Sequence, residues 1–126
     1  MGVSTAAVQI LSGASLSGVI DLAGGVFGGF IIKAAWTAAA VTFQVSVNGI
    51  DYFNLFKSAG VGAPTEVVIG AVATPVQADT FHAVIPADFP DALAHGYRYM
   101  KVRSGTSGAV VAQGATRDIV VAIRFH

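Results

Sequence analysis

The feature that most constrains the fold is a strict alternation of apolar and polar residues from Val41 to Val47. Every odd position in this segment is apolar and every even position is polar, which is typical of a β-strand with one buried face. Asn48-Gly49 follows directly, and this dipeptide favours a tight hairpin because both residues tolerate positive φ. The sequence therefore predicts a hairpin whose return strand runs from Asp51 to Phe56.

The register of this hairpin has two solutions. A two-residue loop pairs Val45 with Tyr52, whereas a three-residue loop pairs Val45 with Phe53. The longer loop also pairs Phe43 with Leu55, which fills the apolar face better. We therefore expect a bulged turn.

Other parts of the chain also show strand patterns. Residues 119–125 alternate, with Ile119, Val121, Ile123 and Phe125 on one face. Residues 97–103 form a second clear strand pattern, with Met100 on the apolar side. The weaker candidates are rich in β-branched residues and bounded by Gly, Ser or Pro. They are Ala7–Leu11, Leu16–Leu22, Phe27–Ala34, Glu66–Val72 and Thr80–Ile85.

About eight short strands separated by turn signals predict an all-β fold, a single antiparallel β-sandwich or a jelly-roll-like barrel. The chain has 126 residues, so we expect one domain over residues 1–126, with residues 1–13 as an extended N-terminal arm. Residues 88–96 predict one short helical turn, with proline near its start and glycine at its end. Residues 104–116 predict a long hairpin or loop, and residues 60–64 a turn.

The composition excludes several classes of protein. Seven basic and seven acidic residues cancel, so the chain has no positive excess for binding nucleic acid by charge. It has no cysteine, which excludes disulfides and thiolate metal sites. Hydrophobic residues reach 54% and charged ones only 11%, against roughly 25% in ordinary soluble domains. Such a chain is too apolar to be disordered and must cover apolar surface in a membrane or in an assembly.

Charges argue against the membrane. The best apolar window, from Val19 to Val41, is interrupted by Asp21 and Lys33, and it falls short of the roughly 20 apolar residues of a spanning helix. Residues 1–20 contain several Ser, Thr and Gln residues and lack the positive start of a secretion signal. We therefore expect no membrane insertion.

No motif predicts catalysis or a cofactor. His82, His95 and His126 do not have the spacing of metal ligands. Asp88 and Asp91 are too few for a calcium loop, and capping of the helical turn is the favoured role for them. Nucleophile-elbow, phosphate-loop and dinucleotide-binding motifs are absent from the sequence. We expect no catalytic residue, no cofactor and no metal.

Four aromatic residues are candidates for a platform that stacks on sugar rings: Trp36, Tyr52, Tyr97 and Tyr99. Aromatic side chains contribute large buried areas to cores and interfaces, so packing is the favoured role. Ligand binding through these residues remains the alternative.

Residues 34–49 read AAWTAAAVTFQVSVNG, a turn that leads into a strand and hairpin. This run resembles a segment of small virion-associated proteins of tailed bacteriophages. Residues 97–106, YRYMKVRSGT, with Gln113 and Arg117, resemble a second segment of the same group. The similarity spans about residues 14 to 124. It implies a β-sandwich protein that decorates or cements the phage head, without catalytic residues.

These observations lead to two hypotheses. The first is a non-enzymatic structural protein of a tailed-phage virion, made in the host cytoplasm, which stabilises the capsid as a homo-oligomer. Its partner would be the major capsid protein or another virion protein, with no nucleic acid or membrane. The alternative is a carbohydrate- or ligand-binding β-sandwich module of a tail or neck component. The candidate interface residues are Val8, Ile10, Leu11, Val26, Phe27, Phe30, Trp36, Val110 and Val111.

Overall fold

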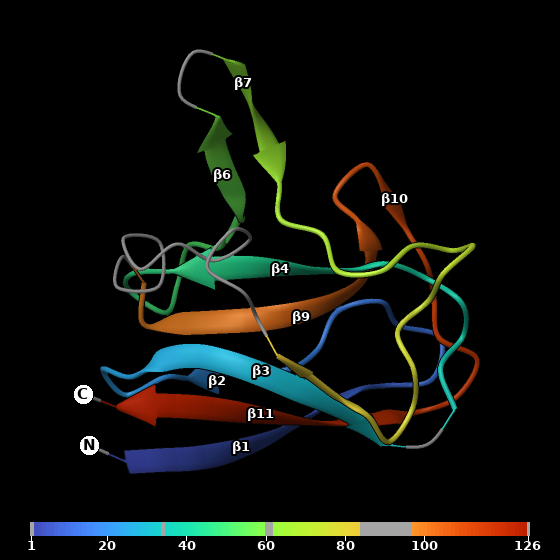
Figure 1. The fold of residues 1–126 in the computed structure, drawn as a ribbon, viewed down its shortest axis with the longest axis horizontal. Coiled ribbons are helices and arrows are strands. Elements are labelled where there is room, and N and C mark those ends of the chain that lie inside the picture. Colours follow the sequence, from blue (N-terminus) through green and yellow to red (C-terminus); the bar gives the residue numbers. More distant parts are fainter. Residues whose placement is uncertain (1, 34, 60–61, 84–96, 126) are drawn as a thin grey trace.

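A computed structural model describes residues 2–33, 35–59, 62–83 and 97–125 of the chain. The described part is all-β, and two antiparallel sheets pack face to face around one core (Figure 1). The β-sandwich prediction is confirmed. The helical turn expected at residues 88–96 lies outside the described residues. Within the described ranges, no helix has the length and apolar character needed to cross a bilayer.

The first sheet has the strand order β1-β11-β3-β8. Its strands are β1 (Gly2–Ile10), β11 (Arg117–Phe125), β3 (Val26–Lys33) and β8 (Phe81–Ala83). The first and last strands of the chain are neighbours here, and Gly2 stands opposite Phe125. The alternation predicted for residues 119–125 is confirmed, because Ile119, Val121 and Ile123 are buried while the residues between them are not.

The second sheet has the order β10-β9-β4-β5, and β2 also pairs with β9. Its strands are β10 (Ala109–Val110), β9 (Tyr99–Thr106), β4 (Val41–Ser46), β5 (Phe53–Asn54) and β2 (Ile20–Asp21). The predicted hairpin register is confirmed: Val45 stands opposite Phe53, and the N–H of Leu55 donates to the C=O of Phe43. Phe53 itself is 68% exposed, whereas Phe43 and Leu55 are buried in the core and Val45 packs against it.

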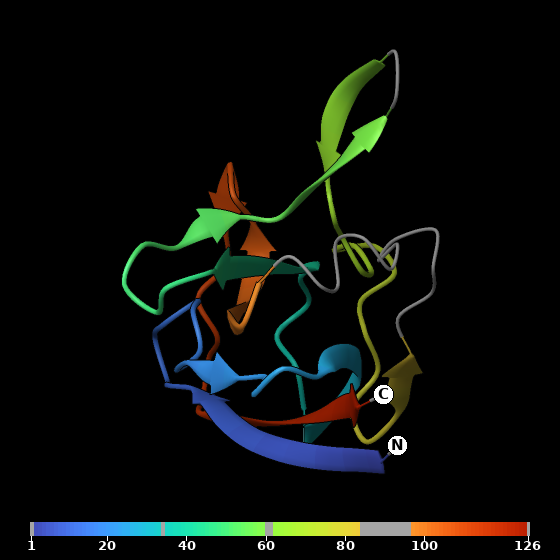
Figure 2. The same ribbon diagram turned by 90° about the vertical axis from the view of Figure 1, so that its left-hand side faces the viewer.

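A separate two-stranded hairpin stands away from the sandwich, as Figure 2 shows. It consists of β6 (Phe56–Ala59) and β7 (Gly62–Glu66). The sequence predicts only a turn at residues 60–64, whereas β7 runs through Pro64. Proline is tolerated in a strand that has a free edge, because one side of the strand needs no N–H donor. The strand expected at residues 66–72 is reduced to a bridge between Ile69 and Val41.

Aromatic rings from both sheets meet in the core. The Phe27 and Phe43 rings, one from β3 and one from β4, lie 5.3 Å apart in an edge-to-face arrangement. Phe30 adds a second contact to Phe43, with ring centres 6.3 Å apart. These rings join the two sheets, because each sheet contributes its apolar face to the same cluster.

Candidate functional site

β1 is the longest sheet edge in the described part of the chain. It ends the strand order of its sheet and pairs with β11 along its whole length, without a register shift. The other outermost strands, β8, β10 and β5, have only two or three residues each. The nine residues of β1 include no charge and no proline, the residues that usually protect a long edge. β1 is therefore open to pairing with another strand.

One hydrogen bond shows which backbone groups of β1 face outward. The C=O of Gln9 accepts the N–H of Gly18 at 3.3 Å, on the side away from β11. Both backbone groups of a strand residue lie on one side, and the side changes at each residue. The backbone N–H and C=O groups of Val3, Thr5 and Ala7 therefore also point away from β11. Among the described residues these groups have no hydrogen-bond partner, so they form a free edge.

The face of this sheet that is turned away from the core is mostly small and apolar. We call its two central rows the outer patch. They are Ala7, Val120, Ile31 and Phe81, and next to them Thr5, Ala122, Gly29 and Ala83. Charged residues lie at the two ends of the patch, with Arg124 at one end and Asp118 beside Lys33 at the other. The outer patch thus continues the free edge of β1 as an apolar surface.

Phe81 covers the backbone at the β3 side of the outer patch. A Cβ added to Gly29 would lie 2.6 Å from the Cζ atom of Phe81, so the ring lies directly over this glycine. The ring remains half exposed because nothing in the described structure covers its other face. Glycine is needed here for the close approach of the ring to the strand.

A hollow of about 680 Å³ opens beside the C-terminal half of β1. Its wall comes from β1, from the loop that follows it and from the start of β11, and it includes Ala7, Leu11, Leu16, Asp118 and Val120. Most of these side chains are apolar. The hollow is therefore a mainly apolar binding site for a side chain, next to the free edge and beside Ala7.

Four of the predicted interface residues belong to the core of the chain itself. All four are 0–3% exposed; Ile10, Phe27 and Phe30 pack in the core cluster between the two sheets, and Val26 stands opposite Arg124 in the first sheet. These four predicted interface residues are therefore covered by their own chain. An apolar strand face has the same sequence pattern whether its own chain or another chain covers it, and here its own second sheet does.

The N-terminal segment does not form the expected arm. Residues 2–10 are held in the sheet by β11, and Val8 packs against the core. Leu11, the next residue, is 59% exposed. A contact with a partner through this segment would therefore use the edge of a fixed strand, because the strand is already paired on its other side.

Val110 and Val111 lie at the hairpin of β9 and β10, in the second sheet. Val110 is exposed and Val111 is half-buried. Because the outer patch belongs to the first sheet, the structure does not bring these valines together with it.

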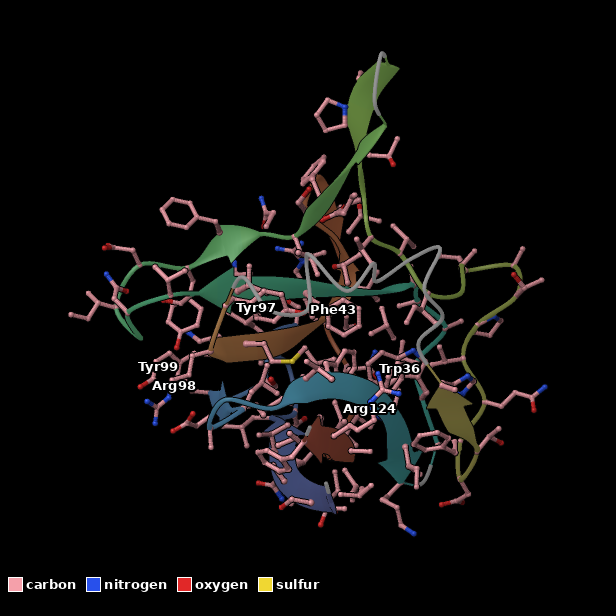
Figure 3. The ribbon with its side chains drawn as sticks, turned by 60° about the vertical axis from the view of Figure 1, so that its left-hand side comes forward. Trp36, Phe43, Tyr97, Arg98, Tyr99 and Arg124 are labelled. Atoms are coloured by element: carbon pink, nitrogen blue, oxygen red, sulfur yellow. The ribbon has the colours of Figure 1, made fainter. Side chains whose placement is uncertain are left out.

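Trp36 and the three tyrosines do not form one platform. Figure 3 shows Trp36 well apart from Tyr97 and Tyr99, towards the opposite end of the sandwich. The indole of Trp36 packs against the core, and its Nε1–H donates to the C=O of Ala39 at 3.2 Å. Burial raises the pKa of the Tyr97 hydroxyl and, together with the charge of Tyr99, that of Tyr52. These hydroxyls therefore stay neutral at physiological pH.

Gln113 and Arg117, singled out by the resemblance, bind the turn that contains Trp36. The buried Gln113 amide accepts the N–H of Thr37 at 2.9 Å and donates to the C=O of the same residue at 3.1 Å. Arg117 donates to Gln113 Oε1 at 3.0 Å and to the Thr37 hydroxyl at 3.1 Å. The turn at Thr37 and the residues Gln113 and Arg117 thus form one hydrogen-bonded unit.

A second polar cluster attaches the protruding hairpin to the sandwich. Arg103 of β9 donates to Glu66 Oε2 and to Asn54 Oδ1, both at 2.7 Å. Its third contact is with the Thr42 hydroxyl at 2.9 Å. Glu66 closes the cluster by accepting the N–H of Ser107 at 3.1 Å. The sequence does not predict this site, because its five members come from four separate strands and one turn.

No metal site is found in the part of the chain that the structure describes, where no three His, Asp or Glu side chains come together. No protein-family model matches the chain, and no curated protein or solved structure matches it significantly. On the surface of the described residues, the free edge of β1 and the adjoining outer patch form one continuous region without charged side chains.

Proposed function

We propose that the chain is a structural assembly protein that binds other protein surfaces and has no catalytic activity. The observation that carries the proposal is the uncharged free edge of β1, continued by the apolar outer patch. A long unprotected edge is a liability for a protein that acts alone, because it pairs with other chains. Extended apolar surface likewise marks sites of protein contact.

We propose further that the assembly is the head of a tailed phage, which the chain decorates by contacts with the major capsid protein. Two segments that resemble virion-associated proteins support this step. Thr37 of the first segment is hydrogen-bonded to Gln113 and Arg117 of the second, so the residues that carry the resemblance form one unit of the fold. A resemblance confined to unrelated surface positions would carry less weight.

The protruding hairpin of β6 and β7 offers a further contact. Its described residues 62–65 are exposed, and it stands clear of both sheets (Figure 2). The Arg103–Glu66 ion pair fixes its base, with both side chains nearly buried. If the chain cements the phage head, its sandwich would bind one subunit of the major capsid protein, and the hairpin would contact a neighbouring subunit.

The proposal is tested on phage particles produced by the strain that carries the gene. Density-banded particles are washed in high salt and analysed by quantitative mass spectrometry. We expect the chain in a fixed ratio to the major capsid protein in independent preparations. Particles from a strain that lacks the gene should release DNA at a lower temperature, and expression of the gene from a plasmid should restore the wild-type value.

The location of the chain decides among the outcomes. Its absence from washed particles would contradict the virion role. Its recovery in isolated tails, with none in heads, would replace the decoration role with a tail or neck role. The carbohydrate-binding alternative would have to do without Trp36 in a shared platform, because Trp36 lies apart from Tyr97 and Tyr99 (Figure 3).

A further inference from the structure

We propose that two copies of the chain pair through β1, antiparallel and about a two-fold axis at Thr5. Their two four-stranded sheets then form one continuous sheet. This inference deepens the proposed assembly role, since it names a second copy of the chain as the occupant of the free edge. It rests on three observations: the pattern of free backbone groups, the position of the hollow, and the distribution of charge.

The free backbone groups select the register. Residues that exchange hydrogen bonds across the new pair must both point outward, so odd residues of β1 pair with odd residues. The C=O of Gln9 is already bonded to Gly18, which leaves Val3, Thr5 and Ala7. A two-fold pairing that uses all three places Thr5 opposite Thr5 and Val3 opposite Ala7. Because Val3 and Ala7 pair twice, once on each side of the axis, the two copies form three residue pairs. Each pair exchanges two hydrogen bonds.

The hollow lies where this register puts the start of the partner strand. Val3 of one copy stands beside Ala7 of the other, and Ala7 lines the hollow. Val3 is 75% exposed in the single chain. Its side chain would gain apolar contact with Ala7, which lines the hollow. The same contact forms twice, once on each side of the axis.

Charge does not oppose the pairing. Arg124 stands opposite Val3 in the sheet, and the two Arg124 residues of a pair lie on opposite sides of the axis. From the usual strand spacing and rise, their Cα atoms are about 20 Å apart. That distance exceeds the Debye length of about 8 Å at physiological salt. The residues next to the axis, Thr5 and Ala122, are uncharged.

The register is tested by cross-linking in a chain that has no natural cysteine. Thr5→Cys puts two thiols opposite each other at the axis, within the distance that a disulfide spans. Ala7→Cys is the matched control, because the same register separates its two Cα atoms by about 14 Å. We expect mild oxidation to give covalent dimers of Thr5→Cys and only monomers of Ala7→Cys. A mixture of Val3→Cys and Ala7→Cys chains should cross-link as a heterodimer.

Self-association is tested by sedimentation velocity of the full chain. An edge contact buries less than about 1,200 Å², so the series should extend from about 10 to 500 μM. We expect the wild type to dimerise within this range and Thr5→Lys to remain monomeric, because two like charges would face each other at the axis. Val72→Lys adds the same charge at an exposed loop position and should dimerise like the wild type.

Two results would overturn the proposal. One is a wild type that stays monomeric throughout the series. The other is equal cross-linking of Thr5→Cys and Ala7→Cys, which would indicate random collision or another register. Circular dichroism of each variant confirms that it is folded. Neither result affects the detection of the chain in particles, so this inference and the virion role fail independently.

Discussion

The few charged side chains that this protein buries are surrounded by several polar partners each. Arg103 is the clearest case, because its guanidinium contacts Glu66, Asn54 and Thr42 and only 5% of its side chain is exposed. Glu66 in turn depends on Arg103, since its other partner is the N–H of Ser107. A buried ion pair of this kind contributes more to specificity than to net stability, and it is sensitive to the loss of one member.

We expect Arg103→Met to lower the free energy of unfolding by about 3–5 kcal/mol, because it leaves the Glu66 carboxylate in a nearly buried site without its cation. Urea unfolding followed by circular dichroism measures the change. The double variant Arg103→Met, Glu66→Met should recover much of the loss, since it removes the second charge as well. A double variant no more stable than Arg103→Met would show that this explanation is wrong.

The exposed pair of Asp21 and Arg98 connects stability with pH. Arg98 donates from Nε and from its terminal nitrogen to the two carboxylate oxygens, at 2.9 and 3.1 Å. These bonds, with a further one from the N–H of Ala23, hold the pKa of Asp21 below its ordinary value of 3.8. The contribution of the ionised carboxylate is therefore complete at neutral pH and is lost as pH falls through the lowered pKa of the folded state.

We expect Asp21→Asn to be slightly less stable than the wild type at pH 7 and equally stable near pH 2. The difference at pH 7 is small because the pair is exposed to solvent, and added salt should reduce it further. Chemical denaturation at the two pH values measures it, and a carbon NMR titration reports the pKa of the carboxyl group directly. An undiminished difference near pH 2 would contradict the assignment.

Among the elements, the β6–β7 hairpin stands outside the sandwich and contributes little to its core. The core residues nearest to it in sequence are Leu55 and Val67, which lie just before β6 and just after β7. The N–H of Val67 donates to the C=O of Leu55 at 3.0 Å, so the base of the hairpin is closed independently of its tip. The outer part of this element is therefore free to serve binding.

We expect replacement of residues 58–64 by Asn-Gly to leave the thermal midpoint of the protein within a few degrees of the wild type. The substitution keeps Glu66, and with it the ion pair to Arg103. In the phage, the shortened chain should be incorporated into particles less than the full chain, as quantified by mass spectrometry. Full incorporation would exclude the hairpin as a contact, and a large loss of stability would show that the core depends on it.

Alternation of apolar and polar residues allows several strands to be predicted from the sequence. In a strand, alternate side chains point to opposite faces, so the apolar residues identify the buried face. The buried positions of β11 and the pairing of Val45 with Phe53 follow from it. The burial of Arg103 does not, since its covering residue, Glu66, belongs to a distant segment. The free edge at Thr5 is equally invisible in the sequence, because it exists only once β1 is known to end its sheet.

For the molecule as a whole, β1 is both an edge and a part of the core. Ile10 at its end is completely buried, and Ala6 and Val8 pack against the central cluster. Substitutions of outward-facing residues of β1 should therefore impair binding without impairing folding. Removal of the whole strand should impair both.

We expect deletion of residues 2–10 to abolish the native fold. Loss of the buried Ile10 side chain alone corresponds to about 2–5 kcal/mol, and a domain has only about 5–15 kcal/mol in total. The deletion also exposes β11 as a new edge. A poorly dispersed NMR spectrum would confirm this, while Thr5→Lys, which changes only an outward-facing residue, should keep a native one. A well-folded deletion variant would show that the remaining strands of the two sheets suffice for the fold.

The pairing of the first strand with the last also determines the order of events in folding. The Gln9–Asp118 contact joins residues 109 positions apart, and closing such a loop has an entropy cost of about 4 kcal/mol. The neighbouring strands β4 and β5 close a much shorter loop. β1 should therefore pair with β11 late in folding. Until β1 pairs, one edge of β11 is free. At high protein concentration, β1 of another copy competes for this edge. The late pairing of β1 with β11 is therefore the common cause of slow folding and of strand exchange between copies.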